Sequence, residues 1–415
     1  MKTVFIKSNG CAVLMHETER IAKYFTENNW KLVDSPDEAS VLVMTCCGVT
    51  NNEEDQAIEM IRDIEKRRMS DSRFFISGCM PAFAADRVMD ASPCAVILKY
   101  SELDALDGAI SASKPFHSIH YNANPQLEEC GDFFLQADDD LRLMREMDEK
   151  YQSRDCERAW EFSTLRKYMW QDGRTYQIKV SYGCPGKCSY CATKLGIGNF
   201  RSVSKQIVMR QFKEGIGKGY MRFLLIGDEI GSYGQDIGTS LPSLLQEMYD
   251  ESLGKAVIAI RYIHPDIFVR DYERMKPFYA SGFVNYFCCA IQSGSANVLK
   301  RMNRNPHLEP FLRCMEDINL HQYPVNKHTQ IIVGFPGETA DDFLLTMDAL
   351  RRCQFDHINI NLYSPRKHTA AWNMGDDVSQ TEKEFRAKLI RSVMRLHKKA
   401  LLYESIKRVV RPSLD

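Results

Sequence analysis

The sequence predicts an α/β protein with an N-terminal parallel α/β sandwich domain followed by a partial barrel of six β/α units. Apolar strands alternate with helical segments along most of the chain, which is typical of parallel sheets covered by helices. Most of the expected strands end in a polar or glycine-containing turn, and sites in such folds lie at the carboxyl ends of the strands. We expect the N-terminal domain over residues 1–120, a connector over 121–172, the partial barrel over 173–375 and a C-terminal helix over 376–415.

The composition excludes several classes of protein. The chain has 415 residues, 44% hydrophobic and 26% charged, so it can bury a large core. Its formal net charge is −1, so any contact with RNA would need a local basic patch. Fourteen cysteines without a secretory leader favour the cytoplasm and thiolates that bind metal rather than form disulfides. No apolar run approaches the ~20 residues of a membrane span, so we expect no membrane contact.

The N-terminal domain places a cysteine after each of three expected strands. These strands span residues 3–6, 39–44 and 73–77, with helices expected over about 17–28 and 53–68 between them. The cysteines are Cys11, Cys47 (or its neighbour Cys46) and Cys79. A lone cysteine is more simply a small buried hydrophobic residue, but parallel strands end at one edge of a sheet. The shared position therefore predicts a site of three thiolates, which would leave one iron of a four-iron cluster open.

A second group of cysteines follows the strand expected at residues 176–180. Residues 181–191 read Ser-Tyr-Gly-Cys-Pro-Gly-Lys-Cys-Ser-Tyr-Cys, which places Cys184, Cys188 and Cys191 in a loop with glycine and proline. A structural zinc site usually has four ligands, whereas three thiolates leave one iron of a cluster free to chelate a small molecule. The spacing favours such a cluster over three unrelated buried thiols.

The remaining strands of the barrel end in candidate cofactor-binding residues. The strands are expected at residues 223–226, 255–262, 286–291, 330–333 and 357–362. The candidates at their ends are Gly227, Asp228, Glu229, Gln292, Ser293 and Gly334. Glycine allows the backbone to approach a ligand, the acids can accept hydrogen bonds from an ammonium group, and the amide and hydroxyl suit a ribose or carboxylate. The alternative is that these residues form only turns and helix caps.

Two segments carry less information. Residues 121–172 predict a connector with at least one helix. Residues 382–411 predict an amphipathic helix, whose basic face is more simply solvated than bound to phosphate.

These motifs resemble the radical S-adenosylmethionine (radical SAM) superfamily, and over residues 1–375 they resemble its methylthiotransferases. The resemblance rests on the cysteine spacing, the segment Gly-Asp-Glu-Ile-Gly-Ser-Tyr-Gly-Gln-Asp from residue 227, and Tyr-Ser-Pro-Arg at 363–366. It implies that Tyr190 lies along the cofactor and that Arg201, at the end of the loop, belongs to the cofactor site. It also favours Cys47 over Cys46 as the ligand. One departure is Leu14, where the family usually has asparagine.

The resemblance further implies two [4Fe-4S] clusters and two uses of S-adenosylmethionine. One molecule methylates a sulfur on the auxiliary cluster of Cys11, Cys47 and Cys79. The other is cleaved to a 5′-deoxyadenosyl radical at the cluster of Cys184, Cys188 and Cys191, with an electron from a donor such as flavodoxin or ferredoxin. The radical removes hydrogen from an unactivated carbon, which then receives the methylthio group. No side chain is assigned a catalytic role beyond cofactor binding.

The substrate class is predicted from the C-terminal end of the sequence. Family members that modify tRNA or a ribosomal protein continue into a small β-barrel, whereas this sequence stops at Asp415 without strand-rich residues. On that ground we expect a peptide or small-molecule substrate. The alternative is a tRNA adenosine of the threonylcarbamoyl-adenosine type, which residues 233–239, Tyr-Gly-Gln-Asp-Ile-Gly-Thr, resemble. Two further alternatives are a sulfurtransferase without methylation and a non-catalytic iron–sulfur sensor.

Overall fold

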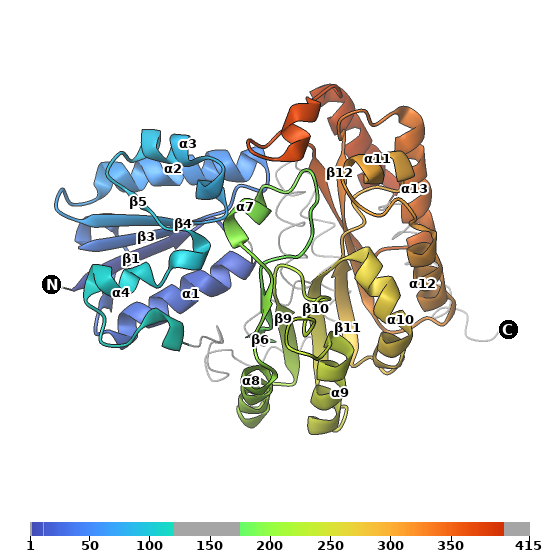
Figure 1. The fold of residues 1–415 in the computed structure, drawn as a ribbon, viewed down its shortest axis with the longest axis horizontal. Helices are drawn as coiled ribbons and strands as arrows, with labels where there is room; N and C mark the ends of the chain where they lie inside the picture. Colours follow the sequence, from blue (N-terminus) through green and yellow to red (C-terminus); the bar gives the residue numbers. More distant parts are fainter. Residues whose placement is uncertain (1, 11, 120–174, 394–415) are drawn as a thin grey trace, which may run out of the picture.

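Two parallel sheets lie side by side in the computed structural model, which describes residues 2–10, 12–119 and 175–393 (Figure 1). The first sheet has five strands in the order β2-β1-β3-β4-β5, and the second has six in the order β13-β12-β11-β10-β9-β6. This is the predicted α/β class, with six parallel strands that leave the barrel open. The connector expected over 121–172 lies outside the described residues, and the domain boundaries stay predictions.

The N-terminal sheet is covered by helices on both faces. Its strands are β1 (Thr3–Ser8), β2 (Lys31–Leu32), β3 (Val41–Cys46), β4 (Arg73–Gly78) and β5 (Val96–Ile97). The helices are α1 (Ala12–Glu27), α2 (Asn51–Arg67), α3 (Ala85–Ala91) and α4 (Ala105–Ile110). Val41 and Val43 of β3 pack with α1 and α4, whereas Leu42 and Met44 pack with α2 and α3. The continuous apolar run of β3 therefore reflects burial on both faces.

The barrel sheet places side chains alternately toward its covering helices and toward its concave face. Its strands are β6 (Thr175–Lys179), β9 (Arg222–Ile226), β10 (Val257–Ile263), β11 (Val284–Cys289), β12 (Asn326–Val333) and β13 (His357–Leu362). The helices are α8 (Lys205–Gly217), α9 (Leu241–Glu251), α10 (Pro265–Ala280), α11 (Ala296–Arg301), α12 (Glu309–Leu320) and α13 (Ala340–Cys353). Phe223 and Leu225 join the large core with the helices, whereas Leu224 and Ile226 join a smaller cluster on the other face. Val13 of α1 packs in that smaller cluster, so the N-terminal domain contacts the inner side of the barrel.

Short elements complete the fold between and after the sheets. Strands β7 (Ser181–Tyr182) and β8 (Arg201–Ser202) form a small antiparallel pair around α7 (Thr193–Ile197). Strands of two residues, such as β2, β5, β7 and β8, are too short to show a hydrophobic period, and none of them was predicted. Helix α1 begins at Ala12 rather than near 17, because the helix-forming residues Ala12–Met15 extend it toward the strand.

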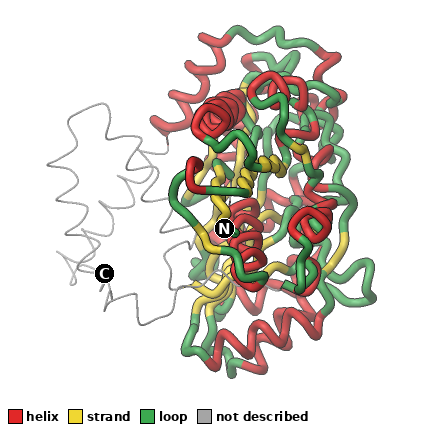
Figure 2. The backbone as a smooth tube through the Cα atoms, turned by 90° about the vertical axis from the view of Figure 1, so that its left-hand side faces the viewer, coloured by secondary structure: helices red, strands yellow, loops and turns green. Residues whose placement is uncertain are grey.

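The C-terminal helix is described only in part. Residues 380–393 are helical, and the rest of the predicted helix lies outside the described residues. Turned so that the N-terminal domain faces the viewer, the molecule shows its strands enclosed between helices (Figure 2). None of the described helices combines the length and the apolar character needed to cross a lipid bilayer.

The glycine that ends β4 gives a test of the local backbone. Gly78 has φ +109°, and a Cβ there would lie 2.5 Å from the carbonyl oxygen of Cys46. We predict that Gly78→Ala lowers the free energy of unfolding by about 2–4 kcal/mol, because both the φ angle and the backbone contact oppose a side chain. Urea denaturation followed by circular dichroism measures the change.

The matched control is Gly108→Ala in α4, where a Cβ would meet open space. Since alanine favours helix, this substitution should raise stability by less than about 1 kcal/mol. Equal destabilisation by the two substitutions would contradict the argument.

Candidate functional site

The three thiols that the sequence predicts to bind the first cluster lie between β7 and α7. Cys184, Cys188 and Cys191 are free of disulfides, and burial raises the pKa of Cys184 to about 11. Among the described residues, their three sulfurs do not form a group within 4.8 Å of one another. A single zinc ion would hold thiolates about 3.8 Å apart, because Zn–S bonds measure about 2.3 Å. These three thiols are the donors that the sequence predicts for a four-iron cluster with one open iron, and the cluster itself stays a prediction.

The backbone of the cluster loop is held by contacts with the barrel. Gly183 has φ +69°, and a Cβ there would lie 2.3 Å from the carbonyl oxygen of Asn199. Its N–H donates to Oδ2 of Asp228 at 2.8 Å, which ties the loop to the end of β9. Within the loop, the Gly186 N–H donates to Sγ of Cys184 at 3.3 Å. An N–H directed at sulfur stabilises the thiolate that a metal requires.

Arg304 places a positive charge beside this loop. Its Nη1 lies 3.6 Å from Sγ of Cys188 and 3.2 Å from the hydroxyl of Tyr190, and Nη2 donates to the carbonyl of Ala290 at 2.7 Å. The residue follows α11 in the chain and was not predicted as part of the site. Its contacts fix Tyr190 next to the thiols, where the resemblance places the cofactor.

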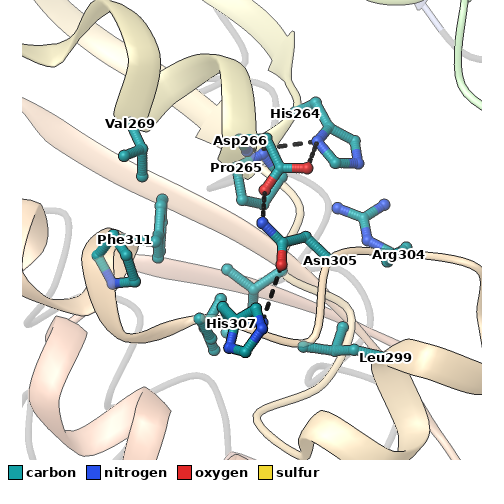
Figure 3. Close-up of a pocket in the computed structure, with 12 residues that line it drawn as sticks. His264, Pro265, Asp266, Val269, Leu299, Arg304, Asn305, His307 and Phe311 are labelled. Atoms are coloured by element: carbon teal, nitrogen blue, oxygen red, sulfur yellow. Dashed lines mark hydrogen bonds and ion pairs between the residues drawn. The ribbon is translucent and has the colours of Figure 1, made fainter.

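A small cavity of about 120 Å³ lies on the other side of Arg304 (Figure 3). The side chain of His264 faces Arg304 across it. Burial lowers the pKa of His264 to about 4, and the charge of Arg304 acts in the same direction. His264 is therefore neutral near pH 7, and its Nδ1 accepts a hydrogen bond from the Asp266 N–H at 3.3 Å.

Of the predicted cofactor residues at the end of β9, Glu229 makes extensive structural contacts. Its carboxylate accepts hydrogen bonds from the N–H groups of Gly231 at 3.0 Å, Ser232 at 2.8 Å and His264 at 3.2 Å. Gly227 is required by close packing, since a Cβ there would lie 2.3 Å from Oγ of Ser181. Asp228 holds Gly183, as described above. These residues therefore shape the loops around the site, and direct contact with a cofactor stays a prediction for each of them.

Gln292 has the features expected of a ligand-binding residue. It has φ +67°, unusual for a residue with a side chain, and its backbone pairs with Gln330 and Ile332 of β12 at 2.9 Å. Its Oε1 is buried and has no hydrogen-bond partner among the described residues. Strained backbone and an unpaired buried acceptor both concentrate at functional sites.

The other predicted cofactor-binding residues, Ser293, Gly334 and Arg201, contact protein groups in three different parts of the barrel domain. The hydroxyl of Ser293 bonds with Thr346 at 3.2 Å and accepts from the Ser295 N–H at 3.1 Å, so it is engaged within the fold. Gly334 has φ +71°, and its N–H donates to Glu338 at 2.6 Å. Arg201 stacks 4.3 Å from the ring centre of Tyr182 and lines a separate cavity of about 530 Å³ beside α1.

Two of the three thiols predicted for the second site lie together. Cys47 and Cys79 belong to one buried cluster, and Cys184 of the first site packs against it. Cys46 instead lies in the core between the sheet and α2, where burial raises the pKa of its thiol well above the usual value. Cys11 lies outside the described residues. The geometry therefore distinguishes Cys47 from Cys46 and places the two thiol sites next to each other.

Asn9 holds the Cys47 turn in place. Its Oδ1 accepts from the Cys47 N–H at 2.9 Å, and its Nδ2 donates to the carbonyls of Cys47 at 3.3 Å and Glu53 at 2.7 Å. These bonds join the end of β1, the turn after β3 and the first turn of α2. Sequence reasoning missed Asn9, although a polar residue at a strand end was a usable signal.

The two thiol sites are held together by close packing of α7 against the turn after β4. A Cβ on Gly196 would lie 2.8 Å from Cα of Cys79 and 3.0 Å from its carbonyl oxygen. Any larger residue would separate Cys79 from the loop of Cys184. The contact explains why α7, which follows the first site directly, touches the second.

A buried ion pair also connects the domains. Nζ of Lys179 in β6 lies 3.1 Å from Glu17 of α1 and 2.7 Å from the hydroxyl of Tyr100. Burial acts to raise the pKa of Glu17, but Lys179, His16 and Arg20 outweigh this effect and hold the pKa well below its usual value. Glu17 is therefore a carboxylate at neutral pH, and its partner Lys179 is a cation.

Comparison with known proteins identifies two family models along the chain. The model of the radical SAM superfamily matches residues 178–350, and that of the uncharacterized protein family UPF0004 matches residues 3–99. The chain is 27% identical to the threonylcarbamoyladenosine tRNA methylthiotransferase of Thermotoga maritima, over 94% of this chain and 81% of that protein. It is 26% identical to the tRNA-2-methylthio-N(6)-dimethylallyladenosine synthase of Thermoanaerobacter pseudethanolicus, over 92% of this chain and 75% of that protein.

Solved structures share the fold at low sequence identity. The radical S-adenosylmethionine methyltransferase TsrM of Kitasatospora setae, with cobalamin and a [4Fe-4S] cluster, superposes with a TM-score of 0.58 at 13% identity. The alignment covers 89% of this chain and 77% of that one. The cobalamin-dependent radical enzyme OxsB gives a TM-score of 0.53 at 14% identity, over 94% and 56% of the two chains. Both likenesses agree with the predicted α/β fold.

The Lys179–Glu17 pair predicts strong coupling between the two domains. Lys179→Met should lower the free energy of unfolding by about 3–5 kcal/mol, because it leaves the Glu17 carboxylate buried without its main partner. The double variant Lys179→Met/Glu17→Gln should recover much of that loss, since it buries no unpaired carboxylate. Chemical denaturation of the wild type, both single variants and the double variant measures the coupling. Additive losses would show that the pair does not stabilise the contact.

Proposed function

We propose that this chain, a radical SAM enzyme homologous to the tRNA methylthiotransferases, transfers a methylthio group to an unactivated carbon of an adenosine in tRNA. One observation carries the proposal: Cys47 and Cys79 lie in a single buried cluster against which Cys184 packs. A site that generates a radical and a site that carries sulfur need this proximity to act on one substrate atom.

The relatives decide which substrate class we propose. The peptide or small-molecule substrate expected from the sequence has no support among the relatives above, whose names specify tRNA. A tRNA adenosine, the alternative, is therefore favoured. The threonylcarbamoyladenosine and dimethylallyladenosine enzymes match at 27% and 26% identity, so we propose the adenosine without choosing its modification.

Cys184, Cys188 and Cys191 are the proposed ligands of the first [4Fe-4S] cluster. When bound, this cluster and S-adenosylmethionine supply the 5′-deoxyadenosyl radical, with an electron from a flavodoxin- or ferredoxin-type donor. Arg304 donates toward Cys188 and holds Tyr190, so the guanidinium offsets negative charge at the thiolates. Gln292 offers its free Oε1 to a donor group of the cofactor.

Cys11, Cys47 and Cys79 are the proposed ligands of the second cluster. Asn9 fixes the backbone of Cys47, and the capping box of Thr50 and Glu53 fixes the start of α2 just beyond it. The N–H groups at this helix start favour negative charge nearby, as a thiolate-bound centre carries. The cytoplasmic location stays a prediction.

Iron content tests the two sites separately. The triple variant Cys184→Ala/Cys188→Ala/Cys191→Ala should retain about four irons per chain, held at the N-terminal site. In that background Cys47→Ala should remove most of the remaining iron, whereas Cys46→Ala should not, because the Cys46 thiol lies in the apolar core. Anaerobic iron and sulfide analysis gives the counts. An iron-free triple variant, or loss of iron with Cys46→Ala alone, would contradict the assignment.

The reaction is tested by incubating the reconstituted full chain with S-adenosylmethionine, dithionite and tRNA that lacks the methylthio group. We expect 5′-deoxyadenosine and a nucleoside heavier by about 46 Da, the mass of an added SCH₂. Binding to tRNA in a gel shift should weaken steeply as salt rises. A nucleoside that gains sulfur alone would indicate a sulfurtransferase. Cluster binding without cleavage of S-adenosylmethionine would indicate a sensor.

A further inference from the structure

Arg366 is a buried cation whose hydrogen-bonding capacity is only partly used. It lies in the loop after β13 and is 5% exposed. Its Nη1 forms an ion pair with the carboxylate of Glu54 in α2. Neither Nε nor Nη2 has a hydrogen-bond partner among residues 2–10, 12–119 and 175–393. Buried guanidinium donors without acceptors are costly, so their persistence indicates a ligand that completes them.

The described carboxylates around Arg366 engage only one of its nitrogens. Glu54 also pairs with Arg87, whose Nη2 bonds Asp55 at 2.7 Å, so two arginines share two carboxylates. None of these carboxylates accepts a hydrogen bond from Nε or Nη2 of Arg366, which leaves both donors available. Burial acts to lower the pKa of Arg366, whereas Glu54, Glu53, Asp55 and, with a smaller effect, a thiolate at Cys47 act to raise it. An anionic centre at Cys47 and the Arg366 cation therefore stabilise each other.

Contacts through Phe83 connect Arg366 to the turn that carries Cys47. Its guanidinium lies 5.8 Å from the ring centre of Phe83, and Phe83 in turn packs against Gly48, since a Cβ there would lie 2.9 Å from Phe83 Cζ. Gly48 directly follows Cys47. The same loop reaches the first site, because the Ala371 N–H donates to the carbonyl of Ser189 at 2.8 Å. In Figure 1 this segment extends from the barrel toward the N-terminal domain.

We propose that Nε and Nη2 of Arg366 bind an anionic sulfur ligand, hydrosulfide or methanethiolate, at the Cys47 centre. The inference rests on the second iron site of the proposed function. The ligand is an anion because it faces cationic donors, and it is small because the guanidinium is buried. It is a sulfur anion because it shares the site with thiolates and an iron that would bind soft donors. Arg366 thereby positions the group that is transferred.

The test measures methanethiolate affinity rather than turnover. The full chain, reconstituted anaerobically with iron and sulfide, is titrated with sodium methanethiolate and followed by visible absorption and by electron paramagnetic resonance of the reduced protein. We expect Arg366→Gln to weaken binding on the order of tenfold or more, the usual effect of losing charge-assisted hydrogen bonds. Arg366→Lys keeps the charge that faces Glu54 but lacks the planar fork, so it should fold normally and bind with intermediate affinity.

Arg87→Gln is the matched control. It removes the other partner of Glu54 but no donor of Arg366, and it should change the affinity by less than about twofold, since its side chain is 43% exposed. Unchanged affinity in both Arg366 variants at normal iron content would overturn the proposal. So would an equal loss in Arg87→Gln, or competition by inorganic phosphate as effective as by hydrosulfide.

The outcomes separate this inference from the proposed function. Methanethiolate binding that depends on Arg366, in a protein that forms no methylthiolated nucleoside from any tRNA, would support the anion site and contradict the proposed reaction. If Cys47→Ala removes no iron and the wild type binds no methanethiolate, the second centre itself is absent and the inference fails with it.

Discussion

The close approach of Gly196 to Cys79 is the contact on which the arrangement of the site depends. Helix α7 follows the loop of the first three cysteines, and it packs against the backbone of the turn that carries Cys79 with no room for a side chain. Two thiol groups from separate sheets are thereby brought into one buried cluster. A rigid backbone contact suits this purpose, because transfer between two centres depends on their distance and orientation.

Buried charges fix the same interface at two other points. Lys179 pairs with Glu17, and Arg366 pairs with Glu54. Each pair joins the barrel to the N-terminal domain. Buried ion pairs add little net stability against apolar residues of the same size, but a misplaced partner is heavily penalised. The two pairs therefore restrict how the domains can dock, in addition to the apolar contacts.

Two buried side chains, Gln292 and Arg366, have polar atoms without hydrogen-bond partners among the described residues. Gln292 leaves Oε1 unpaired at the end of the barrel, and Arg366 leaves two donors unpaired near Cys47, in both cases among the described residues. The first was predicted as a candidate cofactor-binding residue from its side-chain chemistry, whereas no role was predicted for the second. A guanidinium held by one carboxylate is easily taken for a purely structural ion pair. The tertiary structure is needed to show that Nε and Nη2 of Arg366 have no acceptor among the described residues.

The hydrophobic patterns and the spacing of the cysteines were sufficient to predict the α/β class, the longer strands and the two groups of cysteines. These features can be predicted because they depend on residues that are neighbours in the sequence. The same patterns were also sufficient to recognise the homology to methylthiotransferases. The tertiary structure showed that Cys46 and Cys47 lie in different clusters, since adjacent residues of a strand end point to opposite faces, and Cys47 as the ligand stays a prediction. It also revealed Asn9, Lys179, Arg304 and Arg366, whose partners lie far away in the chain. Local spacing does not specify these partners, because Lys179 and Arg366 meet theirs only when the two sheets pack together, and Asn9 and Arg304 only when distant segments of one domain do.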